Sequence, residues 1–253
     1  MIEFMKNYLR LFLCPGSIFA VTFGAALMAG KKPDLWLCLA GALVTFAIYT
    51  LDRLKSSEED AINNPERSSI FLGKEKLFMG LIAASFLAAI LITALIDVWK
   101  VLYVLVPIGT GLIYTARIGG HRLKDIPFAK TIVVATSLGT LTSGLAGFTW
   151  PVFALISMNL AINTIVCDIR DIEGDRLHGV RTIPVMIGTE RTRLLLVVLA
   201  SCMWFLLPLS ILSVTTVIFS YLIFVLPFNE WFVDGSWMII VGISMAISQV
   251  IHI

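Results

Sequence analysis

Residues 151–176 read PVFALISMNLAINTIVCDIRDIEGDR, an apolar run that ends in a dense group of charges. The apolar part is close to the length of a membrane-spanning helix. Asp168, Asp171 and Asp175 follow at spacings of three and four residues. At 3.6 residues per turn, that spacing predicts three carboxylates on one face of a helix. Like charges so close repel one another unless a cation lies between them, so the stretch predicts a cation site at a helix end.

The composition of the whole chain is that of a membrane protein. Of 253 residues, 58% are hydrophobic and only 14% are charged, and the mean hydropathy of +0.92 excludes an ordinary soluble domain. Apolar stretches cover residues 12–30, 35–51, 77–96, 101–116, 126–148, 152–167, 194–212, 214–228 and 236–251. Each approaches the ~20 residues that a helix needs to cross ~30 Å of hydrocarbon. We expect an all-α integral membrane protein, a bundle of nine transmembrane helices in one domain over residues 1–253.

The basic residues predict the orientation of this bundle in a cell membrane. With nine crossings and the N-terminus inside, only Lys31, Lys32 and Lys100 of the 19 Lys and Arg residues fall on the outer side. Basic residues favour the cytoplasmic side of a membrane. We therefore expect a multi-pass protein whose N-terminus and long charged connections are cytoplasmic.

A second mixture of acids and bases lies in the connection 52–76. Asp52, Glu59 and Asp60 are its candidate metal ligands, and Asn63 and Arg67 follow them. The alternative for the acidic residues is a charged loop balanced by neighbouring bases. For Asp168, Asp171 and Asp175 the corresponding alternative is a solvated helix end paired with nearby arginines.

Acidic clusters mixed with bases at membrane depth favour a site for a polyanion bridged by Mg²⁺. This ion prefers oxygen ligands and commonly links one or two carboxylates to substrate phosphates. Arg67, Lys124 and Arg181 are then candidates to contact the outer oxygens of a diphosphate. The net charge of only +2 argues against a nucleic-acid partner.

The motifs resemble those of the UbiA family of intramembrane prenyltransferases. DIRDIEGDR at 168–176, followed by GVRTIP at 179–184, is similar to the second aspartate-rich motif of that family. DAINNPER at 60–67 resembles the segment that ends the first motif, NDxxDxxxD, and YT at 114–115 with RLK at 122–124 resembles the connection between helices four and five. The resemblance covers essentially the whole chain.

The first motif departs from the family pattern. If Asp60 is its last aspartate, Arg53 and Ser56 stand where the family has the other two. Asp52 and Glu59 are seven residues apart, so on a helix they share a face and offer replacement carboxylates. Arg53 is also a candidate to replace part of a metal's charge.

The resemblance implies a Mg²⁺-dependent prenyltransferase. An isoprenyl diphosphate loses diphosphate to give an allylic cation, which a lipophilic acceptor attacks. Asp168, Asp171 and Asp175 are the implied catalytic and metal-binding residues, together with the metal ligands Asp52, Glu59 and Asp60 and the diphosphate contacts Asn63, Arg67, Lys124 and Arg181. Asp175 is a candidate to accept the acceptor's proton.

Several alternatives stay open at this point. The acceptor is either an aromatic quinone precursor or a glycerol-phosphate lipid. A related terpene cyclase or lyase would make the same cation without a second substrate, and a non-catalytic carrier of anionic lipid would need the bundle alone. The prenyl length and the oligomeric state are not specified by the sequence.

Overall fold

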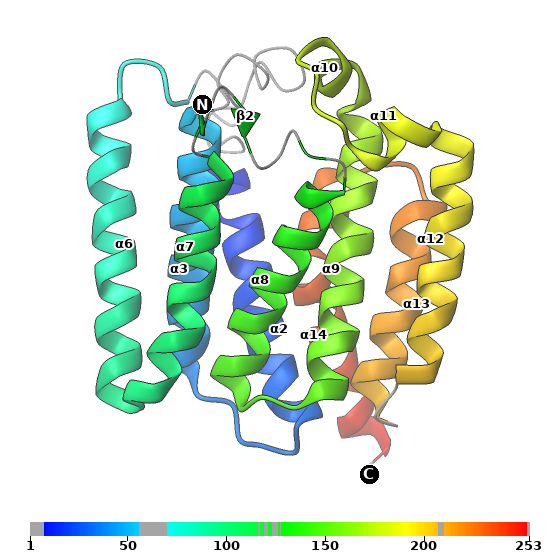
Figure 1. The fold of residues 1–253 in the computed structure, drawn as a ribbon. Coiled ribbons are helices and arrows are strands. Elements are labelled where there is room, and N and C mark those ends of the chain that lie inside the picture. Colours follow the sequence, from blue (N-terminus) through cyan, green and yellow to red (C-terminus); the bar gives the residue numbers. More distant parts are fainter. Residues whose placement is uncertain are drawn as a thin grey trace.

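The computed structural model shows helices standing side by side in one bundle (Figure 1). It describes residues 8–55, 70–115, 117–118, 121–122, 126, 128–206 and 210–251. Long helices in chain order are α2 (Leu13–Met28), α3 (Leu35–Lys55), α6 (Glu75–Ile96), α7 (Val101–Thr115), α8 (Ala129–Ala146), α9 (Trp150–Arg170), α12 (Thr189–Met203), α13 (Ile211–Val225) and α14 (Glu230–Ile251).

Short elements fill the connections. The helices α10 (Ile172–Leu177) and α11 (Ile183–Ile187) lie between α9 and α12, and the 3₁₀ turns η1 (Val98–Lys100) and η3 (Trp204–Leu206) adjoin α7 and α12. β1 (Arg117–Ile118) and β2 (His121–Arg122) form a small antiparallel hairpin after α7. Figure 1 places α10, α11 and β2 at one end of the bundle and the C-terminal end of α14 at the opposite end.

The all-α prediction is confirmed, apart from that small hairpin, but the count of nine crossings is not. The described residues contain eleven α-helices. Five of the described helices are long and apolar enough to cross a membrane: Tyr8–Met28, Leu35–Lys55, Glu75–Ile96, Trp150–Arg170 and Glu230–Ser248. The apolar helices Val98–Tyr114 and Ile211–Val225 are shorter. At 1.5 Å per residue these two helices span about 26 Å and about 22 Å, less than the hydrocarbon core, so length alone does not make them crossings.

Helix α6 shows the environment of the bundle most directly. It is the most apolar of the five candidate spans, yet only 22% of its apolar window is buried inside the protein. Leu87, Leu91 and Leu95 are all exposed on its surface. A helix that is apolar on its outward face is stable in lipid and not in water.

Helix α9 lies at the centre of the packing. It packs against α8 on one side and against α12 and α13 on the other. Its residues join both large hydrophobic clusters, for example Ile156 in one and Ile165 in the other. The buried amide of Asn159 adds a polar link, because it accepts from Trp237 Nε1 at 2.7 Å and donates to Ser220 Oγ at 2.8 Å. The helix that carries the acidic motif is therefore held from several directions.

Candidate active site

A cavity of about 170 Å³ opens among α2, α3, α7, α8, α9 and α14. Its charged lining comes from the ends of four helices, α3, α8, α9 and α14, and from Asp171 just after α9. Polar and charged lining residues include Tyr49, Asp52, Arg53, Tyr114, Lys130, Asn163, Asp168, Arg170, Asp171 and Asp234. The remaining wall is largely apolar and includes Ile48, Pro107, Val133, Val134 and Leu138.

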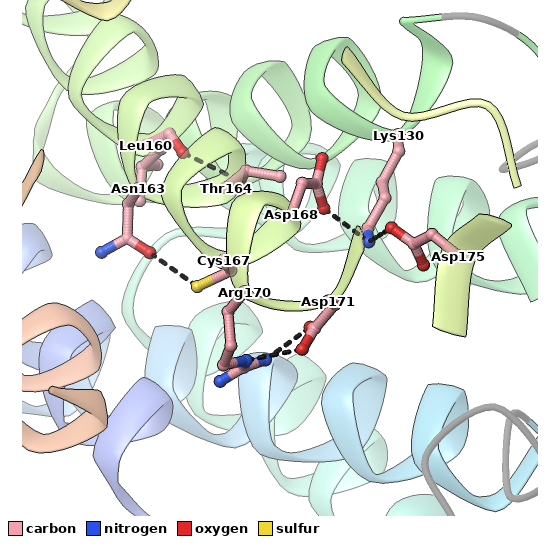
Figure 2. Close-up of polar contacts among 9 residues, drawn as sticks. All are labelled: Lys130, Leu160, Asn163, Thr164, Cys167, Asp168, Arg170, Asp171 and Asp175. Atoms are coloured by element: carbon pink, nitrogen blue, oxygen red, sulfur yellow. Dashed lines mark hydrogen bonds and ion pairs between the residues drawn. The ribbon is translucent and has the colours of Figure 1, made fainter. Parts of the chain in front are cut away.

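The second acidic motif surrounds a lysine. Lys130 Nζ, in the first turn of α8, is 2.6 Å from Asp168 Oδ1 and 3.7 Å from Asp175 Oδ2 (Figure 2). Asp168 is completely buried and Asp175 is 6% exposed. Two buried carboxylates next to each other require a cation between them, and here Lys130 supplies it.

Asp171, the middle aspartate of the motif, has a different partner. Asp171 receives two hydrogen bonds from Arg170, Nε to Oδ1 at 2.6 Å and Nη2 to Oδ2 at 2.5 Å (Figure 2). The guanidinium of Arg170 also lies 5.0 Å from the centre of the Phe228 ring. Paired donors and an aromatic contact hold this arginine in one geometry.

The prediction of one helical face for the three aspartates is wrong. Helix α9 ends at Arg170, and a new helix, α10, begins at Ile172 after the non-helical Asp171. The break turns Asp175 back towards Lys130 and leaves Asp171 at the corner. The solvated helix end considered as an alternative is also only partly right, because Asp168 and Asp175 are buried and pair with Lys130 rather than with an arginine.

The first motif is described only at its start. Asp52 and Arg53 line the cavity from the last turn of α3, and Arg53 is only 7% exposed. Glu59, Asp60, Asn63, Arg67 and Lys124 lie outside the described residues, so their roles stay predictions. Arg181 is exposed in the connection between α10 and α11 and does not belong to the cavity lining, so its contact with a diphosphate also stays a prediction.

Three charged residues of the cavity have no site role predicted from the sequence. Lys130 and Arg170 line the cavity from the first turn of α8 and the last turn of α9. Asp234 lies before the predicted last span, at 236–251, but α14 begins at Glu230 and carries it into the bundle beside the cavity.

Oxygen donors suited to Mg²⁺ are present around the cavity. Asp168 Oδ2 is buried and, among the described residues, has no hydrogen-bond partner. Asp52 and Asp171 line the same cavity. In this arrangement the described residues contain no group of three His, Cys, Asp or Glu close enough to hold a metal ion. The donor chemistry fits magnesium, but Lys130 and Arg170 now engage the carboxylates of the second motif.

Comparison with known proteins identifies the family of the chain. The sequence model of the UbiA prenyltransferase family matches residues 17–238. The chain belongs to the UbiA family. Digeranylgeranylglyceryl phosphate synthase of Thermococcus kodakarensis is 31% identical to this UbiA chain over 184 residues, 66% of the chain and 63% of the relative. The synthase of the same name from Methanothrix thermoacetophila is 30% identical over 206 residues, 77% of the chain and 75% of the relative.

Solved structures of other UbiA homologues share the fold. A homologue from Aeropyrum pernix has a TM-score of 0.66 at 15% identity, covering 92% of this chain and 98% of the homologue. A homologue from Archaeoglobus fulgidus, solved with GPP and Mg²⁺ bound, has a TM-score of 0.58 at 18% identity, covering 98% and 85%. The resemblance noted in the sequence is thus confirmed, and the predicted enzyme class, prenyltransferase, is that of the family. The predicted Mg²⁺ agrees with the ion in the Archaeoglobus structure.

Proposed function

We propose that this UbiA-family chain transfers an isoprenyl group from an isoprenyl diphosphate to the hydroxyl of a glycerol-phosphate lipid within the membrane. One observation carries the proposal. Asp52, Asp168 and Asp171 line the same cavity as Arg53, Lys130 and Arg170, at the end of an apolar bundle. Carboxylates for a metal and cations for phosphate oxygens are the groups that departure of a diphosphate requires.

The helices also offer a place for the isoprenyl tail. Along α8 the cavity wall runs from Lys130 to Leu138, about 12 Å at 1.5 Å per residue, and Val133 and Val134 lie between them. The diphosphate would lie at the charged end and the hydrocarbon along the apolar part. An apolar wall also keeps water from an allylic cation, which water would otherwise trap.

The reaction is a substitution at the allylic carbon. Its C–O bond to the diphosphate breaks and the electron pair leaves with the diphosphate, whose charge Arg53 and Lys130 stabilise. The acceptor oxygen then bonds to that carbon and loses its proton, for which a carboxylate of the second motif such as Asp175 is the proposed acceptor. Asp168 and Asp175, with Asp171 and with Asp52 from α3, would hold Mg²⁺, which would supply further charge stabilisation of the leaving group.

The relatives favour the glycerol-phosphate acceptor over the aromatic one. Both curated relatives described above are named as synthases of digeranylgeranylglyceryl phosphate. By its name this product carries two prenyl groups on glycerol phosphate, so the acceptor would be a singly prenylated glyceryl phosphate. Lipophilic substrates of this kind would reach the cavity from the membrane.

The architecture that accompanies this proposal is a single domain over residues 1–253 with nine crossings of the cell membrane. Four helices outside the five candidate spans would then also cross: α7, α8, α12 and α13. Their flanking residues would extend them, and tilt or local thinning of the bilayer accommodates the remaining shortfall. The N-terminus and the cavity would face the cytoplasm.

Diphosphate release tests the chemistry. Purified protein in detergent is given geranylgeranyl diphosphate, with and without Mg²⁺, as wild type, Asp171→Ala and the exposed control Glu173→Gln. We expect release to need Mg²⁺ and to fall about 100-fold or more in Asp171→Ala but not in the control. Absence of release from folded protein that binds the diphosphate would favour the carrier.

Product analysis then tests the acceptor. Geranylgeranylglyceryl phosphate and 4-hydroxybenzoate are supplied in parallel, and the products are identified by mass. We expect a prenylated glyceryl phosphate. A prenylated phenol would indicate the aromatic acceptor, and a hydrocarbon formed without either acceptor would indicate a cyclase or lyase.

A further inference from the structure

Lys130 lies where the second motif would hold a metal ion. Its ammonium contacts Asp168 at 2.6 Å and Asp175 at 3.7 Å; the two carboxylates are buried, and the Lys130 side chain is 24% exposed. The same ammonium belongs to the lining of the cavity, as does Arg53. One cation therefore contacts the acidic motif (Figure 2) and also lines the cavity that a diphosphate would fill.

We propose that Lys130 competes with the divalent cation for Asp168 and Asp175, and that metal binding releases the Lys130 ammonium to the diphosphate. The part that concerns the diphosphate rests on the proposed function; the competition for the carboxylates does not. Lys130 is then a movable counter-ion that makes metal and diphosphate bind together.

Electrostatics require a cation between these carboxylates at all times. Asp168 is fully buried, so its ionised carboxylate is strongly destabilised without a compensating cation. A lysine and a divalent ion cannot both occupy the space between Asp168 and Asp175 without strong repulsion. When the divalent ion enters, the ammonium must leave.

The two basic residues that pair with the aspartates of the motif, Arg170 and Lys130, differ in how firmly their carboxylate partners hold them. Arg170 is fixed by two hydrogen bonds to Asp171 and by the Phe228 ring. Lys130 makes one close contact, and its contact to Asp175 at 3.7 Å is longer than a hydrogen bond. An ammonium on a flexible four-carbon stem can change partners without moving the backbone. Lys130 is therefore the cation that moves.

The consequence is a coupling between two ligands. Metal alone must displace Lys130 from its close contact with Asp168, whereas a diphosphate gives that ammonium a new partner of opposite charge. Each ligand then raises the affinity for the other by the same factor. Metal affinity without diphosphate is correspondingly low.

Metal binding by Lys130→Gln tests the competition directly. The binding of Mn²⁺ to the full chain in detergent, without any diphosphate, is followed by the electron paramagnetic resonance of free Mn²⁺. We expect Lys130→Gln to bind Mn²⁺ more tightly than wild type, by about 5-fold to 150-fold, the usual range of coupling between sites. Lys130→Arg and the exposed control Lys76→Gln should bind no more tightly than wild type. Equal or weaker Mn²⁺ binding by folded Lys130→Gln would overturn the proposal.

Lysine labelling of wild type gives a second test that needs no variant. Reductive methylation of Lys130 is quantified by peptide mass, with exposed Lys76 as the internal reference. We expect Mg²⁺ to increase labelling of Lys130 and added pyrophosphate to reverse the increase. Labelling that Mg²⁺ leaves unchanged or reduces would contradict displacement.

The two tests separate this inference from the proposed function. If Mn²⁺ affinity and Mg²⁺-dependent labelling change as expected but pyrophosphate has no effect and prenyl diphosphate is not cleaved, the competition stands and the proposed reaction fails. If cleavage occurs but Lys130→Gln binds Mn²⁺ no more tightly, the reaction stands and the competition fails.

Discussion

Arg53 stands where the family pattern has an aspartate, and its surroundings give the substitution a physical meaning. The side chain is 7% exposed and lines the cavity next to Asp52. An arginine at this position cannot be a metal ligand, since a guanidinium has no acceptor and stays protonated. It can instead donate several hydrogen bonds to phosphate oxygens. We expect the change to exchange a metal ligand for a direct contact to the diphosphate.

We therefore expect Arg53→Gln to weaken binding of the isoprenyl diphosphate. Loss of a charge-assisted hydrogen bond costs about 1.5–3 kcal/mol, which corresponds to about 10-fold to 150-fold in affinity. Isothermal titration with a non-hydrolysable geranylgeranyl diphosphate analogue measures it, and Lys55→Gln, exposed on the same helix, is the control. An unchanged affinity would mean that Arg53 only neutralises the charge of Asp52 and does not contact the diphosphate.

At the scale of helices, the break between α9 and α10 decides the shape of the site. Asp168, Asp171 and Asp175 are spaced for one face of an unbroken helix, and no Pro or Gly marks a break at Asp171. The chain nevertheless leaves the helix there, with φ −91° and ψ 10°. The contact of Asp175 with Lys130 comes from α8, which is remote in sequence. Local spacing cannot predict an interruption that accompanies such a tertiary contact.

Helices α7 and α8 pack closely where Gly144 of α8 meets Tyr103 of α7. A Cβ at Gly144 in α8 would overlap the ring of Tyr103 in α7, at the rigid atoms where the ring joins its side chain. We expect Gly144→Ala to lower the stability in detergent by about 1–3 kcal/mol, because overpacking forces the helices apart. Thermal unfolding measures the effect.

The matched control is Gly80→Ala in α6, where a Cβ would meet nothing within 4 Å. It should be neutral or slightly stabilising. The cost of Gly144→Ala should also vanish in a Tyr103→Ala background, since the two residues then no longer overlap. If Gly144→Ala still lowers the stability in the Tyr103→Ala background, the loss of stability does not come from the contact between α7 and α8.

For the molecule as a whole, composition and motifs predicted more than spacing did. The helical class and the UbiA family followed from apolar runs and from DIRDIEGDR, because hydropathy and short motifs are local properties. The cavity did not follow, since Lys130, Asp168 and Asp234 come from three helices that only packing brings together. The number of crossings depends on helices such as α12 and α13, whose 15 residues leave their length ambiguous.

The orientation of the whole bundle in the membrane can be measured with reporter fusions. Lys31, Lys32 and Lys100, expected outside, line one small pocket together, at the opposite end of α3 from Asp52 and Arg53. With nine crossings and the active cavity inside, a reporter joined after Ile253 lies outside and one joined after Val180 lies inside. We expect alkaline phosphatase to be active and green fluorescent protein dark at the first position, with the reverse at the second. Fluorescence at both positions would mean an even number of crossings after Val180, and phosphatase activity at the second would place the cavity outside, against the positive-inside bias.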